Sequence, residues 1–443
     1  MKKIGFVSLG CPKNLVDSEV MMGLVKERGY ELTADEHEAE IIVVNTCAFI
    51  NPAKEESVDT ILEMAQLKQT GRCRKLIVTG CLVERYRDVL VHEMPEIDAV
   101  LGTNEVEEIL RACEDQANPA RAVGPTPYLY DHTTPRVLST PRYTAYIKIA
   151  EGCDHRCDFC VIPRLRGPMR SRRPESVVEE ARRLVEQGVR EIVLVGQDTT
   201  HYGEDLGLRH GLAELLKRLA RVDGLAWVRF MYGYPHHISD ELLDVVASEE
   251  TLCKYFDIPF QHVSQRILHR MQRGGSRAAL EHLVERIRRR IPHAALRTSF
   301  ITGYPGETEE EFQELLDHVR QIQFDHVGVF VYSDEEGTGA SEHPDKVPRR
   351  IAQARRRILM QEQARISKQK NRQLVGQRRR VLLEGTSPES EYLLQGRLES
   401  QAPEIDGCVL INEMPDDCAV EPGQFVTVQI TRAFAHDLLG RIV

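Results

Sequence analysis

The sequence predicts an α/β protein of three domains joined by one linker. Short strand-like runs alternate with helical patterns at the start of the chain, and the same alternation resumes after a proline-rich stretch. Towards the C-terminus the helical patterns stop, and turn residues separate several short strand-like pieces. We therefore expect an N-terminal domain with a parallel sheet (1–112), a linker (113–140), a central α/β domain that ends in a basic helix (141–375) and a small antiparallel β-barrel (376–443).

Composition and charge describe an ordinary globular chain. Hydrophobic residues make up 42% of the 443 residues and charged residues 28%. The net charge of -10 gives no general argument for nucleic-acid binding. No apolar run approaches the roughly 20 residues of a membrane span, and the run behind Lys2 and Lys3 is too short for a secretory signal. We therefore expect a cytoplasmic protein without a membrane partner.

Three cysteines follow the predicted strands of the N-terminal domain. The chain has eleven cysteines, which in a cytoplasmic protein indicate metal binding or catalysis rather than disulfides. Each predicted strand is followed, one or two residues later, by a cysteine: Ile4–Leu9 by Cys11, Ile41–Asn45 by Cys47 and Leu76–Thr79 by Cys81. Because parallel strands end at one edge of a sheet, the three thiols could converge and hold a metal cluster. The alternative is that they are small buried hydrophobes, as core cysteines often are.

The central domain is expected to form an incomplete parallel barrel. The linker before it carries Pro119, Pro125, Pro127, Pro135 and Pro141. Six candidate strands follow, with helical segments between them: Ala145–Ile149, Glu191–Val195, Ala226–Tyr232, Tyr255–Phe260, Ala295–Ile301 and His326–Tyr332. A closed barrel of this type has eight strand–helix units, so six units indicate a partial (βα)6 barrel.

Directly after the first of these strands, three cysteines stand at C-x3-C-x2-C spacing: Cys153, Cys157 and Cys160. A four-iron cluster usually takes one thiolate per iron, so three close cysteines leave one iron free to bind a substrate. Two alternatives stay open. A structural zinc site would use His155 as its fourth ligand, although this residue lies too close between the cysteines for the usual zinc spacing. A ferredoxin-like centre would need a fourth cysteine.

The chain ends with two segments of opposite charge. Residues 349–380 contain twelve Lys or Arg and a single acid, and Ile351, Ala354 and Ile358 keep helical spacing, which predicts a long helix docked by that face. Its charged residues form either a solvated face or a phosphate-binding surface. Residues 381–443 contain eleven acids and three arginines, so this barrel should repel RNA and attract a basic partner.

With both cysteine triples placed, the chain resembles from end to end the methylthiotransferases, a radical S-adenosylmethionine family. The resemblance is carried by VSLGCPKNLVDSE (Val7 to Glu19), EGCDHRCDFCVIP (Glu151 to Pro163), DIPFQH (Asp257 to His262) and GYPGET (Gly303 to Thr308). Family members combine an N-terminal cluster domain, a radical S-adenosylmethionine barrel and a C-terminal TRAM β-barrel. The chain is most similar to the branch that modifies a ribosomal protein. The branch that modifies tRNA typically has Gly-Cys-Gln-Met-Asn where this chain has Gly10-Cys11-Pro12-Lys13-Asn14.

The resemblance implies two 4Fe-4S clusters and S-adenosylmethionine as cofactors. It assigns one cluster to Cys153, Cys157 and Cys160, and the second to Cys11, Cys47 and Cys81. The cofactor contacts that we expect are Phe159, with the adenine, and Gln261 and Arg297, with the amino-acid end. As alternatives, Gln261 could cap a strand and Arg297 could pair with a core acid.

The implied reaction adds a methylthio group to the β-carbon of an aspartate in ribosomal small-subunit protein S-twelve. The implied partners are this protein substrate, neighbouring ribosomal RNA, a sulfur donor and an electron donor. One alternative is a tRNA methylthiotransferase that acts on an isopentenyladenosine of the anticodon loop. An alternative from another class is a non-catalytic protein that carries iron–sulfur units or electrons, and the spacing of three thiolates with one open iron speaks against it.

Overall fold

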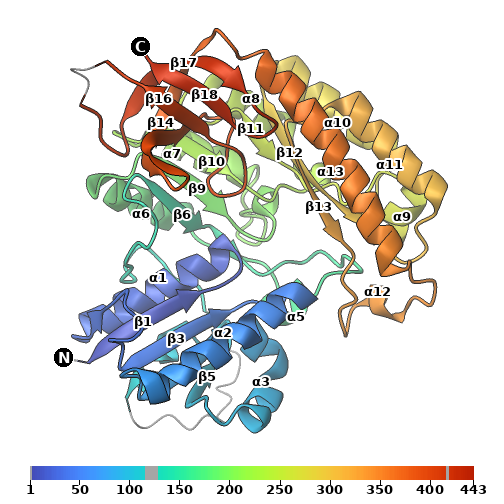
Figure 1. Cartoon of the computed structure of the whole chain (residues 1–443). Helices are drawn as coiled ribbons and strands as arrows, with labels where there is room; N and C mark the ends of the chain where they lie inside the picture. The colour runs from blue at the N-terminus through green and yellow to red at the C-terminus, as the bar shows by residue number, and fades with distance from the viewer. Residues whose placement is uncertain (1, 115–127, 416–418) are drawn as a thin grey trace.

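The computed structural model describes residues 2–114, 128–415 and 419–443. Three of the linker prolines (Pro119, Pro125 and Pro127) and two of the C-terminal acids (Asp416 and Asp417) lie outside these residues. Figure 1 shows the N-terminal domain in blue beneath a larger green and yellow domain, with a small red barrel at the top. The α/β architecture that the sequence predicts is confirmed.

Five parallel strands form the N-terminal sheet in the order β2-β1-β3-β4-β5. Their bounds are β1 Lys3–Ser8, β2 Glu31–Leu32, β3 Ile41–Thr46, β4 Lys75–Gly80 and β5 Ala99–Leu101. One face packs on α1 (Pro12–Glu27), η1 (Val106–Glu108) and α4 (Ile109–Cys113), and the other on α2 (Asn51–Thr70) and α3 (Cys81–Glu93). Because helices cover both faces, the central strand β3 is buried along its whole length, which explains its continuous apolar run.

The central domain is an open arc of six parallel strands, as the sequence predicts. The strands are β6 Thr144–Lys148, β9 Glu191–Val195, β10 Trp227–Phe230, β11 Tyr255–Asp257, β12 Ala295–Thr302 and β13 His326–Val331. They form two three-stranded sheets, β10-β9-β6 and β11-β12-β13. A hydrogen bond from the Gly233 N–H to the Asp257 carbonyl oxygen, 2.8 Å long, joins the ends of β10 and β11, so the two sheets continue one another.

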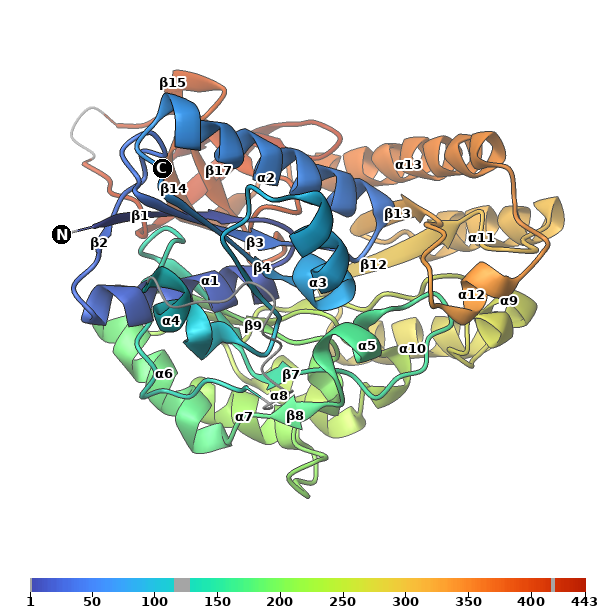
Figure 2. The same ribbon diagram turned by 90° about the horizontal axis from the view of Figure 1, so that it is seen from below.

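Helices cover the outer face of the arc (Figure 2). They are α6 Pro174–Glu186, α7 Gly211–Leu219, α8 Asp240–Ser248, α9 Gln265–Arg270, α10 Arg277–Arg290 and α11 Glu309–Ile322. The shorter elements are β7 Ala150–Glu151, α5 Ile162–Arg166, β8 Arg170–Ser171, η2 Thr199–His201, η3 Pro235–His237 and α12 Gly339–Glu342.

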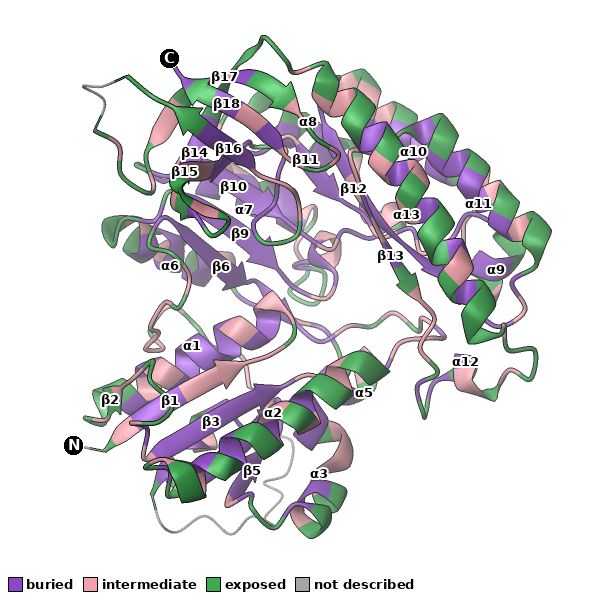
Figure 3. Cartoon of the chain, in the orientation of Figure 1, coloured by how far each residue is buried: buried purple, intermediate pink, exposed green. Residues whose placement is uncertain are grey.

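The strands of the arc alternate between two hydrophobic cores. Ile147, Ile192 and Leu194 point outward and pack under the helices. Tyr146 and Val193, their chain neighbours, point inward and share a core with residues of α1 and of the C-terminal barrel. The inner face of the incomplete barrel is therefore covered by the other two domains, and Figure 3 shows the strands other than β13 buried along most of their length.

The basic helix α13 (Arg349–Arg372) docks by a different face from the one that the sequence suggests. Ile351 and Ile358 are 37% and 42% exposed. The buried face carries Ala352, Leu359 and Ile366, each seven residues apart, and it packs on the arc. The predicted face was therefore wrong by one residue, which corresponds to a rotation of about 100° around the helix axis. The reason is that this segment contains two neighbouring rows of apolar residues at helical spacing. The helix also ends at Arg372, and the last three arginines of the basic run begin a strand.

Five strands close the C-terminal barrel in the order β14-β15-β16-β18-β17. Their bounds are β14 Arg378–Ser387, β15 Ser390–Arg397, β16 Val409–Glu413, β17 Phe425–Ala433 and β18 Leu438–Ile442. The small barrel is confirmed, and all neighbouring strands are antiparallel except β16 and β18. Among the described residues, no helix is long and apolar enough to cross a membrane.

The barrel is attached to the arc by buried polar contacts as well as apolar ones. The Arg397 guanidinium pairs with Glu191 of β9 at 2.5 Å, and the Arg229 guanidinium donates to the Glu399 carbonyl oxygen at 2.8 Å. The Tyr255 hydroxyl donates to the Asp406 carboxylate at 2.7 Å. Most of these partners lie at the amino-terminal halves of the arc's strands, so the carboxyl ends stay directed towards the cysteine loops.

Candidate active site

The structure places Cys11, Cys47 and Cys81 at one edge of the N-terminal sheet. Cys11 precedes α1, Cys47 follows β3, and Cys81 is the first residue of α3. The loops lie close together: a Cβ added at Gly10, whose φ is +89°, would stand 3.0 Å from the sulfur of Cys47. The convergence that the strand ends predict is therefore present, and the role of the thiols as cluster ligands stays a prediction.

Electrostatics distinguishes these three thiols. Burial raises the pKa of Cys47 to about 11 and also raises the pKa of Cys81. Burial acts on Cys11 in the same direction, but the positive charges of Lys13 and Arg166 outweigh it, so the pKa of Cys11 is lowered. A lowered thiol pKa favours the thiolate, which is the form that binds metals.

The second triple lies on the loop between β7 and α5, at the carboxyl end of the arc's first strand. Two donors point at its sulfurs: the Arg273 guanidinium lies 3.4 Å from the sulfur of Cys157, and the Ile162 N–H lies 3.5 Å from that of Cys160. Burial raises the pKa of Cys153 to about 11 and that of Cys160 to about 12. Partly buried thiols with donors already aimed at two of their sulfurs are arranged to hold thiolates once a metal lowers these pKa values.

His155, between two of these cysteines, has partners other than the thiols. Its Nε2 lies 2.7 Å from an oxygen of Asp198, and His237 Nδ1 lies 3.1 Å from the same oxygen. The ring of His155 stacks on Tyr234 with 3.9 Å between ring centroids. These contacts give the imidazole partners other than the cysteine sulfurs. His155, Asp198 and His237 also form a group of side chains that could hold a metal ion, so the zinc alternative stays open.

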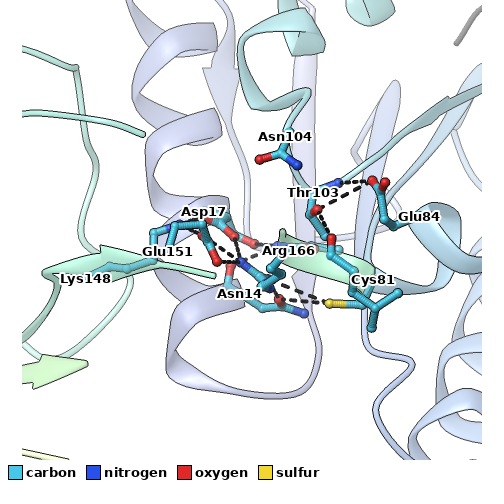
Figure 4. Close-up of polar contacts among 12 residues, drawn as sticks. Asn14, Asp17, Cys81, Glu84, Thr103, Asn104, Lys148, Glu151 and Arg166 are labelled. Carbon is cyan, nitrogen blue, oxygen red and sulfur yellow. Dashed lines mark hydrogen bonds and ion pairs between the residues drawn. The ribbon is translucent and has the colours of Figure 1, made fainter. Parts of the chain in front are cut away.

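A buried network of charges joins the two cysteine sites (Figure 4). Arg166, at the end of α5, contacts Asp17 at 3.1 Å and Glu151 at 2.9 Å through Nη1. Its Nη2 donates to Asn14 Oδ1 and lies 3.7 Å from the sulfur of Cys81. Arg166 follows the second cysteine triple by only six residues and touches a cysteine of the first triple, so one side chain connects the loops of both sites.

Lys148 completes this network. Its ammonium donates to Asp17 and to Glu151, the latter at 2.6 Å. Two cations and two carboxylates thus share one buried space, and the pKa of Glu151 is held far below its usual value: burial would raise it, but Arg166 and Lys148 outweigh burial. No spacing or pattern in the sequence indicates this network, although Asp17 and Glu151 lie within the two stretches that carry the cysteine motifs.

The three expected cofactor contacts lie in different surroundings. Phe159 is half-buried against the apolar cluster around Tyr304. Gln261 follows β11 with a φ of +69°, a conformation that is rare outside glycine and marks a constrained site. Arg297 donates to Asp257 at 2.7 Å and lies 3.6 Å from Asp406 of the C-terminal barrel. The alternative partner expected for Arg297, a core acid, is thus present, and the assignment of all three residues to the cofactor stays a prediction.

Three family models match the chain in succession. The uncharacterized protein family UPF0004 matches residues 3–102, the radical SAM superfamily matches 147–319, and the TRAM domain matches 375–443. Their order is the order of the three domains described above.

Curated relatives match over the whole chain. The chain is 51% identical to a protein of Koribacter versatilis (strain Ellin345) and 53% identical to one of Solibacter usitatus (strain Ellin6076). The alignments cover 100% of this chain and 96% and 95% of the two relatives. Both relatives are named ribosomal protein uS12 methylthiotransferase RimO.

Among solved structures, the chain is similar to the radical S-adenosylmethionine methyltransferase TsrM from Kitasatospora setae. The identity is 18%, the TM-score is 0.55, and the alignment covers 75% of each chain. At this identity the similarity concerns the fold alone.

Proposed function

Because the chain belongs to the family of the ribosomal protein uS12 methylthiotransferases, we propose that it transfers a methylthio group to the β-carbon of an aspartate in uS12. It is a radical S-adenosylmethionine enzyme. The observation that carries the proposal is the contact of Arg166, six residues after Cys160, with the sulfur of Cys81. The tRNA alternative is not supported, since relatives that match over the full chain are named for a ribosomal protein.

The residues present fit two 4Fe-4S clusters. We propose that one is held by Cys153, Cys157 and Cys160 and the other by Cys11, Cys47 and Cys81. Donors from Arg273, Ile162 and Arg166 lie at the sulfurs, as the outer hydrogen bonds of cluster thiolates do. When bound, the clusters and S-adenosylmethionine supply the one-electron cleavage that activates a C–H bond and the methylthio group that replaces the hydrogen.

The protein itself orients the two sites relative to each other. Arg166 and Lys148 hold the N-terminal helix α1 against the cysteine loop, and all the carboxylates that they contact are buried. Phe159, Gln261 and Arg297 are the proposed contacts for S-adenosylmethionine. Since the reaction consumes a sulfur atom and electrons, we include a sulfur donor and an electron donor among the partners, and ribosomal RNA as a neighbour of the substrate.

The count of two clusters is tested by iron analysis. Alanine at Cys153, Cys157 and Cys160 should remove about half of the iron, because the other site lies on a separate domain and keeps its cluster. The same variant should no longer cleave S-adenosylmethionine. Alanine at Cys73 and Cys113, two buried cysteines outside both triples, is the matched control and should leave the iron unchanged. Loss of all iron in the first variant would show that the two sites are not independent.

The roles of the two sites separate in product analysis. A variant with alanine at Cys11, Cys47 and Cys81 should still cleave S-adenosylmethionine but yield no methylthiolated uS12. Mass spectrometry of uS12 incubated with each variant measures this directly. If that variant makes normal product, the N-terminal triple has no part in the sulfur transfer.

A further inference from the structure

One buried cation of the active site lacks the carboxylate partner that the others have. Lys13 lies in the first turn of α1, two residues after Cys11, and is 8% exposed. Its ammonium lies 3.4 Å from the centre of the Tyr232 ring, which the central domain contributes. The side chain therefore reaches from the N-terminal cysteine site to the carboxyl end of β10, where the two domains meet.

The neighbouring buried cations all pair with carboxylates. Lys148 and Arg166 contact Asp17 and Glu151, and Arg172 pairs with Glu180 at 2.5 Å. For Lys13 no ion pair or hydrogen bond with an acid is found among the residues that the structure describes. The face of an aromatic ring compensates a desolvated ammonium only partly. A cation held this way at a domain junction is arranged to receive an anion from outside the chain.

The partner of Lys13 across the junction is also strained. Tyr232 is not a glycine, yet its φ is +62°, and it lies two residues after the end of β10. Its N–H donates to Asp257 at 2.9 Å, which helps to hold it in this conformation. Asp257 itself pairs with Arg297, so it is not free to serve Lys13. Strained non-glycine residues persist where the surroundings enforce them, and they are frequent at ligand sites.

We propose that the Lys13 ammonium is the binding site for the side-chain carboxylate of the substrate aspartate. This inference rests on the proposed function, in which the substrate carries a carboxylate on the very carbon that is modified. A carboxylate paired with Lys13 gives the buried ammonium the carboxylate partner that the neighbouring cations have. It also brings the substrate aspartate to the N-terminal thiols, because Lys13 is two residues from Cys11. The selectivity for aspartate then has a physical basis, since an amide or an apolar side chain leaves the cation unpaired.

The test compares two enzymes on two substrates. The reconstituted full-length protein and its Lys13→Met variant are assayed with uS12 and with uS12 in which the modified aspartate, located by mass spectrometry, is changed to asparagine. The rate on the aspartate form gives kcat/KM, and the asparagine form, used as a competitor, gives its inhibition constant. Lys26→Met, which removes an exposed lysine from the last turn of the same helix, is the matched control. Lys13→Arg tests whether another cation rescues the loss.

We expect Lys13→Met to lower kcat/KM on the aspartate form about 30-fold or more, the cost of truncating one partner of a buried charge pair. The inhibition constant of the asparagine form should stay within about twofold, and iron content should match the wild type. Equal losses on both forms, or lost iron, would mean that Lys13 serves the cluster or the fold, and this would overturn the inference. If the wild-type enzyme itself leaves uS12 unmodified, the proposed function fails, whatever Lys13 does.

Discussion

At the scale of single residues, the site is organised by charges that are buried in pairs. Asp17 comes from the N-terminal domain, and Lys148, Glu151 and Arg166 come from the central domain; all four are at most 5% exposed. Two positive and two negative side chains balance one another there, and each carboxylate has a cation within hydrogen-bond reach. Such pairs stabilise little in total but strongly favour one arrangement of the two domains, since a broken pair leaves a bare buried charge.

Substitution of Arg166 tests whether the buried charge network holds the two domains together. Arg166→Gln should leave Asp17 and Glu151 with one cation fewer, which costs roughly 3–5 kcal/mol at the junction. Arg164→Gln changes an exposed arginine on the same short helix and should cost less than about 0.5 kcal/mol. Hydrogen exchange of the α1 amides measures the difference, with protection falling by about 100-fold or more in the first variant. Equal protection in both variants would show that the network does not hold the domains together.

At the scale of elements, helix α13 shows how packing selects one of two apolar rows. Leu359 is fully buried against the arc, whereas its neighbour Ile358 is 42% exposed. Arg355 joins the buried row because Glu307 and Glu309 pair with its guanidinium at 2.9 and 3.1 Å. A buried arginine in the docked face hides that face from a pattern search, because the search counts apolar residues only.

The two rows of α13 give a direct comparison. Leu359→Ala should destabilise the protein by about 2–5 kcal/mol, since it leaves a cavity, while Ile358→Ala should cost less than about 1 kcal/mol. Urea unfolding followed by helical circular dichroism measures both. A larger loss for Ile358 than for Leu359 would mean that the helix docks by the row that the sequence suggests.

At the scale of the whole molecule, some acids of the C-terminal barrel form ion pairs within the protein and others are exposed at its surface. Asp406 and Glu384 pair with arginines at the junction with the arc or within the barrel, so they are not available to a partner. Glu404, Glu413 and Glu421 are exposed. These three offer the negative surface that a basic ribosomal protein would meet.

This surface leads to a prediction about substrate binding. Changing Glu404, Glu413 and Glu421 to lysine should raise the KM for uS12 several-fold and weaken its dependence on salt, because attraction between exposed charges is screened by salt. Asp406 is left in place, since its loss would disturb Arg297. The control changes Glu55, Glu56 and Glu63 on α2, which lies at the opposite end of the molecule in Figure 1. An equal rise of KM in the control would show that this acidic surface has no specific part in binding uS12.

Much of the architecture follows from local patterns in the chain. The buried strand β3 and the six strands of the arc are short runs rich in aliphatic and aromatic residues, and their bounds agree with the predicted ones within a few residues. The cysteines are also found from local patterns. Cys153, Cys157 and Cys160 are recognised by their spacing, and Cys11, Cys47 and Cys81 are each recognised from the strand that ends just before them. Strands β2 and β5 have two and three residues, too few to produce a pattern.

The sequence by itself determined the order of the domains and the strands of the arc, because each depends on residues that are close in the chain. It also predicted the six cysteines as cluster ligands. Only the tertiary structure decided the face of α13, the pairing of Arg166 with Asp17 and the lack of an acid beside Lys13. Arg166 and Asp17 are 149 residues apart, and their contact exists only because two domains fold against each other. Whether a charge is paired or left for a ligand depends on which distant residues become its neighbours, and no local pattern records that.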